Sequence, residues 1–411
     1  MKKQFIALLL CATISLGVVG CGGNSNEKAP ETDGGQASST DSSNDSQVSD
    51  DAGEAAQSTS SEGSIKIGGL APLTGNVAQY GITTTNGANL FFKELNEKGG
   101  ILGKQVEYLV EDEEGDPQKA ILAYKKLVEN DKVVAVLGDV TSGPSTAAAS
   151  ASQEYNTPMI AATATAAEVT KQGPNVFRAC FLDPFQGTTM ATFASTKLNA
   201  KTAGVIFNNG DDYSIGLKDA FISTCQELGI EIVATESFGN DDVDYRSQLG
   251  NIAAKNPDVL FVPDYYGKVV NIIAQARELN LNVPCLGADG WDGVLQSTPD
   301  AATLENCYFS NHYSTEDTDP VVQNFLKNYE ATYGEAPTSF AALGYDAAMI
   351  LTNAIEKAGT ADDAQKIIDA MLATDVTGVT GHITFDEERN PKKSCAIILI
   401  KEGKYTLFDK L

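Results

Sequence analysis

The feature that most constrains this chain is an alternation of short apolar runs with longer helical stretches, which occurs in two consecutive units. In the first unit the apolar runs have the length and composition of strands buried in a parallel sheet. The stretches between them are bounded by helix signals such as Gly99-Gly100 and Asp116-Pro117. The order predicts a doubly wound sheet, with strands at residues 65–70, 106–110, 133–137 and 159–161 and helices at 84–98, 117–130 and 145–155.

The same order begins again after Asp183-Pro184. The second unit has expected strands at residues 203–207, 230–234, 259–262 and 283–287, and expected helices at 214–228, 245–255 and 268–279. Two similar units predict an α/β fold of two doubly wound, Rossmann-like lobes with a cleft between them. Ligands of open α/β sheets bind beyond the carboxyl ends of the strands, so the loops at those ends are the candidate site.

The N-terminus predicts export. Lys2 and Lys3 precede an apolar run at residues 5–19, and the run ends in Val-Val-Gly before Cys21. This pattern is typical of a signal peptide at residues 1–20 with a lipobox, in which Cys21 becomes the lipidated first residue. The run is short for a spanning helix, which needs about 20 residues. The alternative is an uncleaved anchor, and both interpretations place the following chain outside the cytoplasm.

Residues 22–63 are rich in Ser, Gly, Asn, Gln and acids, with Lys28 as their only base. Such a segment cannot bury enough apolar surface to fold, and its acids repel one another, so residues 21–63 are expected to form the lipidated tether. A tether of this length favours a cell with a single membrane and a thick wall, the Gram-positive type. The net charge of −26 disfavours nucleic acid and anionic lipid as partners. Contact with the membrane is therefore expected through the lipid anchor only.

Two loops of the first unit carry groups suited to a carboxylate. The loop at residues 138–146 contains Thr141 and Ser142 directly before a helix, and the loop at 163–168 contains Thr165. Hydroxyls and the amides of a helix N-terminus donate hydrogen bonds to anions. The alternative for Ser142 is that it only caps its helix.

Two loops of the second unit carry acids and aromatic residues. The loop at residues 263–267 contains Tyr265, and the loop at 288–293 contains Asp289 and Trp291. An acid would pair with a ligand ammonium group while aromatic rings cover its apolar part. The alternative for Asp289 is an ordinary turn residue before Gly290.

Catalysis is not expected, because the chain lacks the groups that it needs. His312 and His382 are the only histidines, and there is no nucleophile elbow, phosphate-binding loop or zinc spacing. No cofactor and no metal are therefore predicted.

Five cysteines follow the tether, an odd number that leaves at least one free thiol. Most are expected to be small buried side chains. A disulfide between Cys285 and Cys307 remains open, provided that two strands bring them together.

Several motifs together resemble the leucine/isoleucine/valine-binding protein family of ABC-transporter receptors. They are Ile65-Lys-Ile-Gly-Gly-Leu-Ala-Pro-Leu-Thr-Gly75, Val77-Ala-Gln-Tyr80-Gly81, Asn96-Glu-Lys-Gly-Gly-Ile101, Asp116-Pro117 and Gln275-Ala-Arg277-Glu-Leu279. The resemblance covers residues 64–411. It implies a type I periplasmic-binding fold with interlobe crossings near Phe185, His312 and Phe385. Lobe 1 would then contain residues 64–184 and 313–385, and lobe 2 residues 185–312 and 386–411.

The resemblance also implies a site for an amino acid, branched-chain in the first instance. Ser142, Thr165 and the amide of Ala164 would hold its carboxylate. Asp289 with Tyr213 and Tyr265 would hold its ammonium group, and Tyr80 would lie beside the pocket.

The chain departs from the family pattern at some positions. It has Asp289 where a family member has Glu, Trp291 is expected to reshape the pocket, and the family's first-lobe disulfide is absent, with Gly115 and Thr141 at the matching positions. Permease subunits of an importer are the implied partners. The alternatives are a sensor module with the same fold, or a binder of amides or small carboxylic acids.

Overall fold

The computed structural model describes residues 63–411 and arranges their strands in two large sheets and one small hairpin. The expected signal peptide, Cys21 and nearly all of the tether lie outside the described residues. Among the described residues, no helix is both long enough and apolar enough to cross a membrane.

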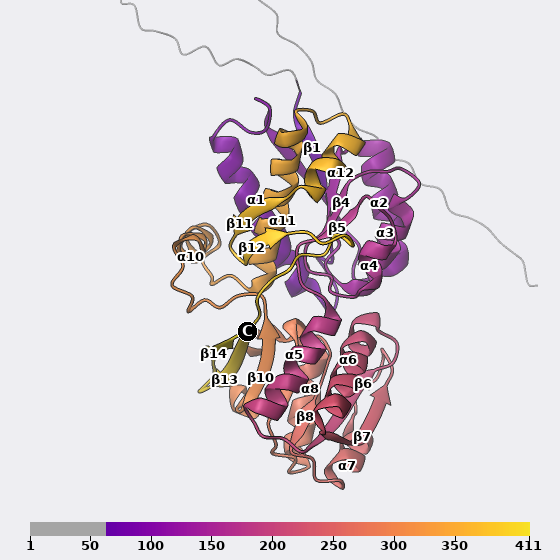
Figure 1. Cartoon of the computed structure of the whole chain (residues 1–411), viewed down its shortest axis with the longest axis vertical. Helices are drawn as coiled ribbons and strands as arrows, with labels where there is room; N and C mark the ends of the chain where they lie inside the picture. The colour runs from indigo at the N-terminus through magenta and orange to yellow at the C-terminus, as the bar shows by residue number, and fades with distance from the viewer. Residues whose placement is uncertain (1–62) are drawn as a thin grey trace, which may run out of the picture. The chain divides into compact units, whose positions relative to one another are not determined.

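The first lobe is built on a five-stranded parallel sheet in the order β2-β1-β3-β4-β5. Figure 1 shows α1 and α11 on one side of this sheet and α2, α3 and α4 on the other. Two apolar clusters, one on each face, form the core. The strands are β1 (Ile65–Ala71), β2 (Val106–Asp112), β3 (Ala135–Leu137), β4 (Met159–Ala161) and β5 (Val176–Arg178). The helices are α1 (Ala78–Glu97), α2 (Pro117–Lys126), α3 (Ser142–Ser152), α4 (Glu168–Lys171), α10 (Pro320–Tyr333), α11 (Ser339–Ala358) and α12 (Ala364–Leu372).

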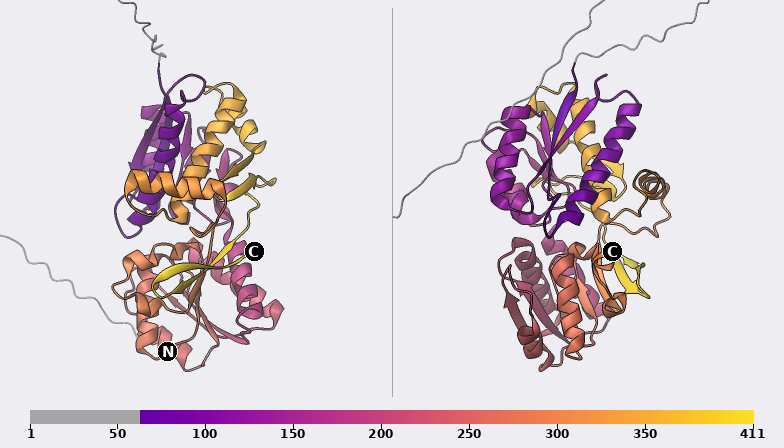
Figure 2. Two further views of the ribbon diagram at one scale, coloured as in Figure 1. Left: turned by 90° about the vertical axis from the view of Figure 1, so that its left-hand side faces the viewer. Right: turned by 180° about the vertical axis from the view of Figure 1, so that it is seen from behind.

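Helix α1 begins earlier than the sequence predicted, at Ala78 instead of Thr84. Gly81 lies inside the helix, where a Cβ would stand 2.0 Å from the Pro72 carbonyl oxygen. Gly344 of α11 is constrained in the same way, because a Cβ there would lie 2.1 Å from the Thr84 carbonyl oxygen. These glycines serve close packing, and α11 (orange in Figure 2) lies against α1 from the far end of the chain.

The second lobe is built on a seven-stranded sheet in the order β14-β13-β10-β9-β8-β6-β7, in which β13 is antiparallel to both of its neighbours and the other pairs are parallel. α5 and α6 pack on one face, and α7 and α8 on the other. The strands are β6 (Thr202–Asn208), β7 (Glu231–Phe238), β8 (Val259–Phe261), β9 (Cys285–Gly287), β10 (Cys307–Asn311), β13 (Ala396–Lys401) and β14 (Lys404–Lys410). The helices are α5 (Asp183–Thr196), α6 (Asp212–Leu228), α7 (Arg246–Ala253), α8 (Tyr266–Glu278) and α9 (Val294–Ser297). The two doubly wound sheets contain the eight strands that the sequence predicted, and β5, β10, β13 and β14 in addition.

Strands β9 and β10 bring Cys285 and Cys307 opposite each other in register. Both are buried free thiols, as are the other three cysteines of the described residues. The strands thus place the two side chains as the open disulfide hypothesis required, but the structure contains no bond between them.

The chain passes between the lobes after β5, after β10 and after the hairpin of β11 (Asp375–Gly378) and β12 (Gly381–Thr384). The third crossing lies later than the expected position near Phe385. Residues 386–393 still contact the first lobe, because Arg389 donates to the Val176 and Thr170 carbonyls, and Lys393 Nζ donates to the Ala179 carbonyl at 2.9 Å. The assignment of these residues to the second lobe was therefore wrong.

Two buried carboxyl groups lie where β2 and β3 end. Glu113 and Asp139 are both fully buried. Burial raises the pKa of each, and for Glu113 the neighbouring Asp139 carboxyl raises it further. Each group therefore binds its proton more tightly in the folded protein than in the unfolded chain, where carboxyl pKa values are about 4.

We expect the stability of the wild-type protein to fall as pH rises from about 5 to about 9, because the folded state binds more protons than the unfolded state in this range. Glu113→Gln replaces one of these two carboxyl groups with an amide, which stays neutral at every pH in this range. At pH 8 the variant should be more stable than wild type by at least about 1 kcal/mol, with little difference near pH 4. Urea unfolding at several pH values measures this, with the exposed Glu114→Gln as control. Parallel pH profiles for wild type and Glu113→Gln would contradict the assignment.

Candidate functional site

A small cavity lies between residues of the two lobes, at the carboxyl ends of their strands. The first lobe contributes hydroxyl groups and the second lobe contributes two tyrosines and an acid. Its free volume of about 10 Å³ is about what one water molecule needs, so the lobes must move apart to admit a solute. The lining residues are Val140, Thr141, Ser142, Thr163, Thr165, Phe340, Tyr213, Tyr265, Asp289 and Gly290.

Ser142 is the first residue of α3, and its side chain does not cap that helix. The N-cap is Thr141, which makes no side-chain cap bond. The Ser142 hydroxyl oxygen instead accepts a hydrogen bond from the Ala166 amide at 3.2 Å, which ties the two predicted loops together. The alternative that Ser142 is a cap was therefore wrong, and its hydroxyl lies at the helix N-terminus where an anion would bind.

The second loop is held by a residue that the sequence analysis missed. Arg178, at the end of β5, is fully buried and donates to the carbonyls of Ala164 and Ala166, each at 2.8 Å. Thr165, between these two residues, lines the cavity, whereas Ala164 is buried behind it. No sequence motif near Arg178 predicts this role, since a single arginine at the end of a short strand is not part of a recognisable pattern.

Asp289 lies directly beyond β9 in a short 3₁₀ turn and is buried against the cavity. Its Oδ1 accepts hydrogen bonds from the Tyr213 hydroxyl and from Gln186 Nε2, both at 2.9 Å. The ring of Tyr265 stacks on Tyr213 with centroids 4.8 Å apart. The structure thus brings together the three second-lobe residues that the sequence singled out, and it shows Asp289 in a site where a carboxylate is stabilised by donors.

Two further contacts of Asp289 come from residues that the sequence analysis did not place in the site. Gln186 lies in the first turns of α5, and His312 Nε2 lies 3.2 Å from Asp289 Oδ2. Neither side chain lines the cavity. The only signal in the sequence was their position next to expected crossings.

Contacts between the lobes close the cavity. Tyr80 does not itself line the cavity; it stacks on Phe340 of its own lobe with centroids 4.2 Å apart, and its hydroxyl donates to the Gly290 carbonyl of the other lobe. The same hydroxyl accepts from the Tyr266 amide at 3.0 Å. On α11, the Ser339 amide donates to Asp292 Oδ2 at 2.7 Å. The structure therefore represents a closed arrangement of the lobes.

Trp291 does not reshape the pocket, contrary to expectation. Its ring is fully buried in the core of the second lobe, where its Nε1 donates to the Val262 carbonyl at 2.9 Å. Gly287 accommodates it, because a Cβ at that residue would lie 2.0 Å from the ring. In a 3₁₀ turn, which has three residues per turn, side chains two positions apart point in different directions, so Trp291 does not follow Asp289 toward the cavity.

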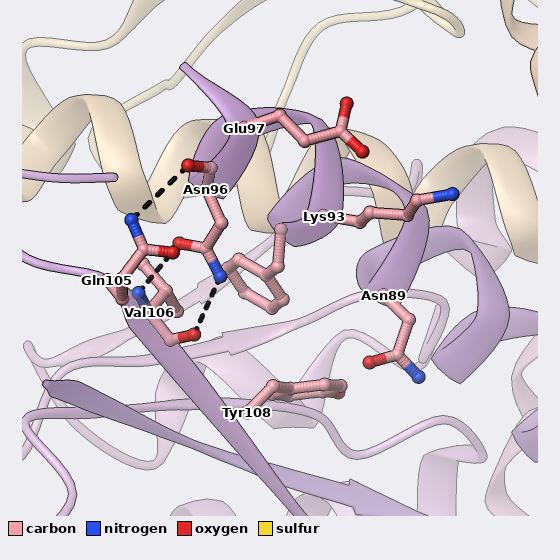
Figure 3. Close-up of a pocket in the computed structure, with 8 residues that line it drawn as sticks. Asn89, Lys93, Asn96, Glu97, Gln105, Val106 and Tyr108 are labelled. Carbon is pink, nitrogen blue, oxygen red and sulfur yellow. Dashed lines mark hydrogen bonds between the residues drawn. The ribbon is translucent and has the colours of Figure 1, made fainter. Parts of the chain in front are cut away.

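A larger hollow lies on the surface of the first lobe between α1 and β2 (Figure 3). The side-chain amides of Asn96 and Gln105 bond to the protein's own backbone. Asn96 accepts from the Val106 amide at 2.8 Å and donates to the Val106 carbonyl at 2.9 Å, and Gln105 donates to the Asn96 carbonyl. These bonds fix the edge strand β2. Because the hollow is open to solvent and holds no buried charge, it is a weaker candidate than the closed cavity.

Within residues 63–411, no group of three or more His, Cys, Asp and Glu side chains is placed to hold a metal ion. The cavity holds hydroxyls, amides and one acid, and it encloses a space between two lobes. Fold and site together define a solute-binding protein.

The chain belongs to the periplasmic binding protein family, whose model matches residues 64–401. The Leu/Ile/Val-binding protein BraC3 of Rhizobium johnstonii is 30% identical over 325 residues, which cover 79% of this chain and 88% of BraC3. These matches confirm the resemblance that the sequence motifs indicated.

Two solved structures share the fold closely. A leucine binding protein, LivK, from Thermotoga maritima has a TM-score of 0.80 and 32% identity, with coverage of 84% of this chain and 98% of that one. A branched-chain amino acid transporter substrate binding protein, LivJ, from Streptococcus pneumoniae, solved in complex with isoleucine, has a TM-score of 0.80 and 33% identity, with coverage of 85% and 99%.

Proposed function

We propose that this chain is the extracytoplasmic solute-binding protein of an ABC importer and that it captures a small α-amino acid, preferably a branched-chain one. The observation that carries the proposal is the closed cavity with Ser142 and Thr165 on one lobe and Asp289 on the other. A zwitterion needs donors at one end and an acceptor at the other, and this arrangement provides both. The relatives named for leucine, isoleucine and valine support the same ligand class.

Each group has a distinct role in the proposed complex. Ser142, Thr165 and the backbone amides at the start of α3 and near Ala164 bind the ligand carboxylate. Asp289 accepts from the ammonium group, with Tyr213 and Tyr265 packed beside it. The apolar side chains of Val140 and Phe340, which also line the cavity, contact the aliphatic part of the ligand. Closure of the lobes is binding without chemistry, and no catalytic role is proposed.

The closed form is the species that we expect the permease subunits to recognise, because closure changes the relative position of two surfaces.

We further propose that Cys21 carries the lipid anchor and that the acidic segment before residue 64 tethers the protein to a Gram-positive type membrane. Metabolic labelling with a radioactive fatty acid tests this. Label that persists in Cys21→Ser would contradict it.

A thermal-shift screen of residues 64–411 tests the ligand class. A ligand that binds only the folded protein stabilises it by about 2.7 kcal/mol at about 100 times its Kd, so branched-chain amino acids should raise Tm clearly. Urea and benzoate should have little effect. An increase in Tm with an amide or an aromatic acid, and none with the amino acids, would contradict the proposal.

A further inference from the structure

The Asp289 carboxylate is held by a set of donors that do not themselves reach the cavity. Gln186 makes two hydrogen bonds to Asp289. Its Nε2 donates to the carboxylate oxygen Oδ1 at 2.9 Å, and its Oε1 accepts from the Asp289 backbone amide at 3.0 Å. His312 Nε2 contacts the other oxygen, Oδ2, at 3.2 Å. With Tyr213, which lines the cavity, three side chains thus hold the carboxylate.

Both residues are themselves fixed by the segments that join the lobes. Gln186 follows the first crossing, and its Oε1 also accepts from the Ser310 hydroxyl at 2.8 Å. His312 follows β10 at the second crossing, and its ring stacks on Phe181 of the first crossing with centroids 3.7 Å apart. The orientation of Asp289 is therefore determined by the hinge and not by its own short turn.

The proton on His312 can be assigned from these contacts. The ring is fully buried, and burial lowers its pKa, so the imidazole is neutral. A carboxylate accepts hydrogen bonds and cannot donate them, so Nε2 carries the hydrogen. Burial of Asp289 then leaves a carboxylate with three protein donors, one of them on Oδ2, and with acceptor capacity toward the cavity.

We propose that His312 and Gln186 are positioning residues that aim the Asp289 carboxylate at the ligand ammonium group and thereby set the preference for an amino acid over an uncharged analogue. This inference rests on the proposed function. An aspartate is one methylene shorter than a glutamate, so its reach depends on how firmly its carboxylate is oriented. Without these donors the carboxylate is free to turn away from the cavity.

The experiment compares two ligands that differ only in this group, isoleucine and its 2-hydroxy acid, by calorimetric titration. The variants are His312→Leu, His312→Gln and Gln186→Leu. The exposed His382→Leu is the matched control. The measured quantity is the ratio of the two affinities, which a general loss of packing does not change.

We expect His312→Leu and Gln186→Leu each to lower the ratio by about tenfold or more, the loss expected for a hydrogen bond to a charged group. His312→Gln keeps an N–H donor and should retain most of the preference. Equal losses for both ligands, or an unchanged ratio in both leucine variants, would overturn the inference while leaving the proposed function intact. A wild-type protein that binds both ligands equally well would instead refute the proposed function.

Discussion

Replacement of Asp289 by alanine is expected to abolish useful binding of a branched-chain amino acid. The ammonium group would then be buried without a partner, a loss of about 3–5 kcal/mol. That corresponds to about two to four orders of magnitude in Kd. Calorimetric titration of wild type and variant with isoleucine measures it.

The matched control is Asp241→Ala, an exposed acid of the same lobe, which should bind like wild type. Circular dichroism must show that Asp289→Ala is folded, because the change also removes a partner from Tyr213, Gln186 and His312. A folded variant that keeps wild-type affinity would show that the ammonium group is held elsewhere.

Arg178→Met is expected to weaken both the fold and the site. It removes the charged donor from the buried carbonyls of Ala164 and Ala166, which keep only the Cys180 thiol and the Val169 amide as donors. Each lost hydrogen bond to a charged group costs about 1.5–3 kcal/mol. Part of this loss is offset because a charge no longer has to be buried. We expect the free energy of unfolding to fall by about 2–4 kcal/mol, and the affinity for isoleucine to fall with it because Thr165 loses its support.

Urea unfolding and titration of the same protein separate the two effects. The control is Arg246→Met in the second lobe, whose side chain is 49% exposed and pairs with Glu278 on the surface. Its effect should lie within about 0.5 kcal/mol. Unchanged stability in Arg178→Met would contradict the role of the guanidinium, and lower stability with full affinity would limit that role to folding.

The sequence predicted the sheets and the loops at their carboxyl ends because these are local patterns. Short apolar runs of about five residues are typical of buried parallel strands, and the four loops that follow them contain Ser142, Thr165, Tyr265 and Asp289. Tyr213 and Tyr80 were found through the family resemblance. The positions of all six beside one cavity follow from the topology once the strands are placed.

The residues that support the site were not predictable from local pattern. Arg178, Gln186 and His312 act through contacts with residues far from them in sequence, and none of them lies in a motif. The third crossing was misplaced because Arg389 and Lys393 hold their segment on the first lobe through carbonyl contacts that composition does not reveal.

The measurement that tests the account most directly is calorimetric titration of residues 64–411 with isoleucine and with its deaminated and decarboxylated analogues. The account predicts micromolar or tighter binding of isoleucine, and a large loss when either the ammonium or the carboxylate is removed, because each end of the zwitterion has its own partner in the cavity. A deaminated analogue that binds as well as isoleucine, or no binding of any branched-chain amino acid, would contradict it.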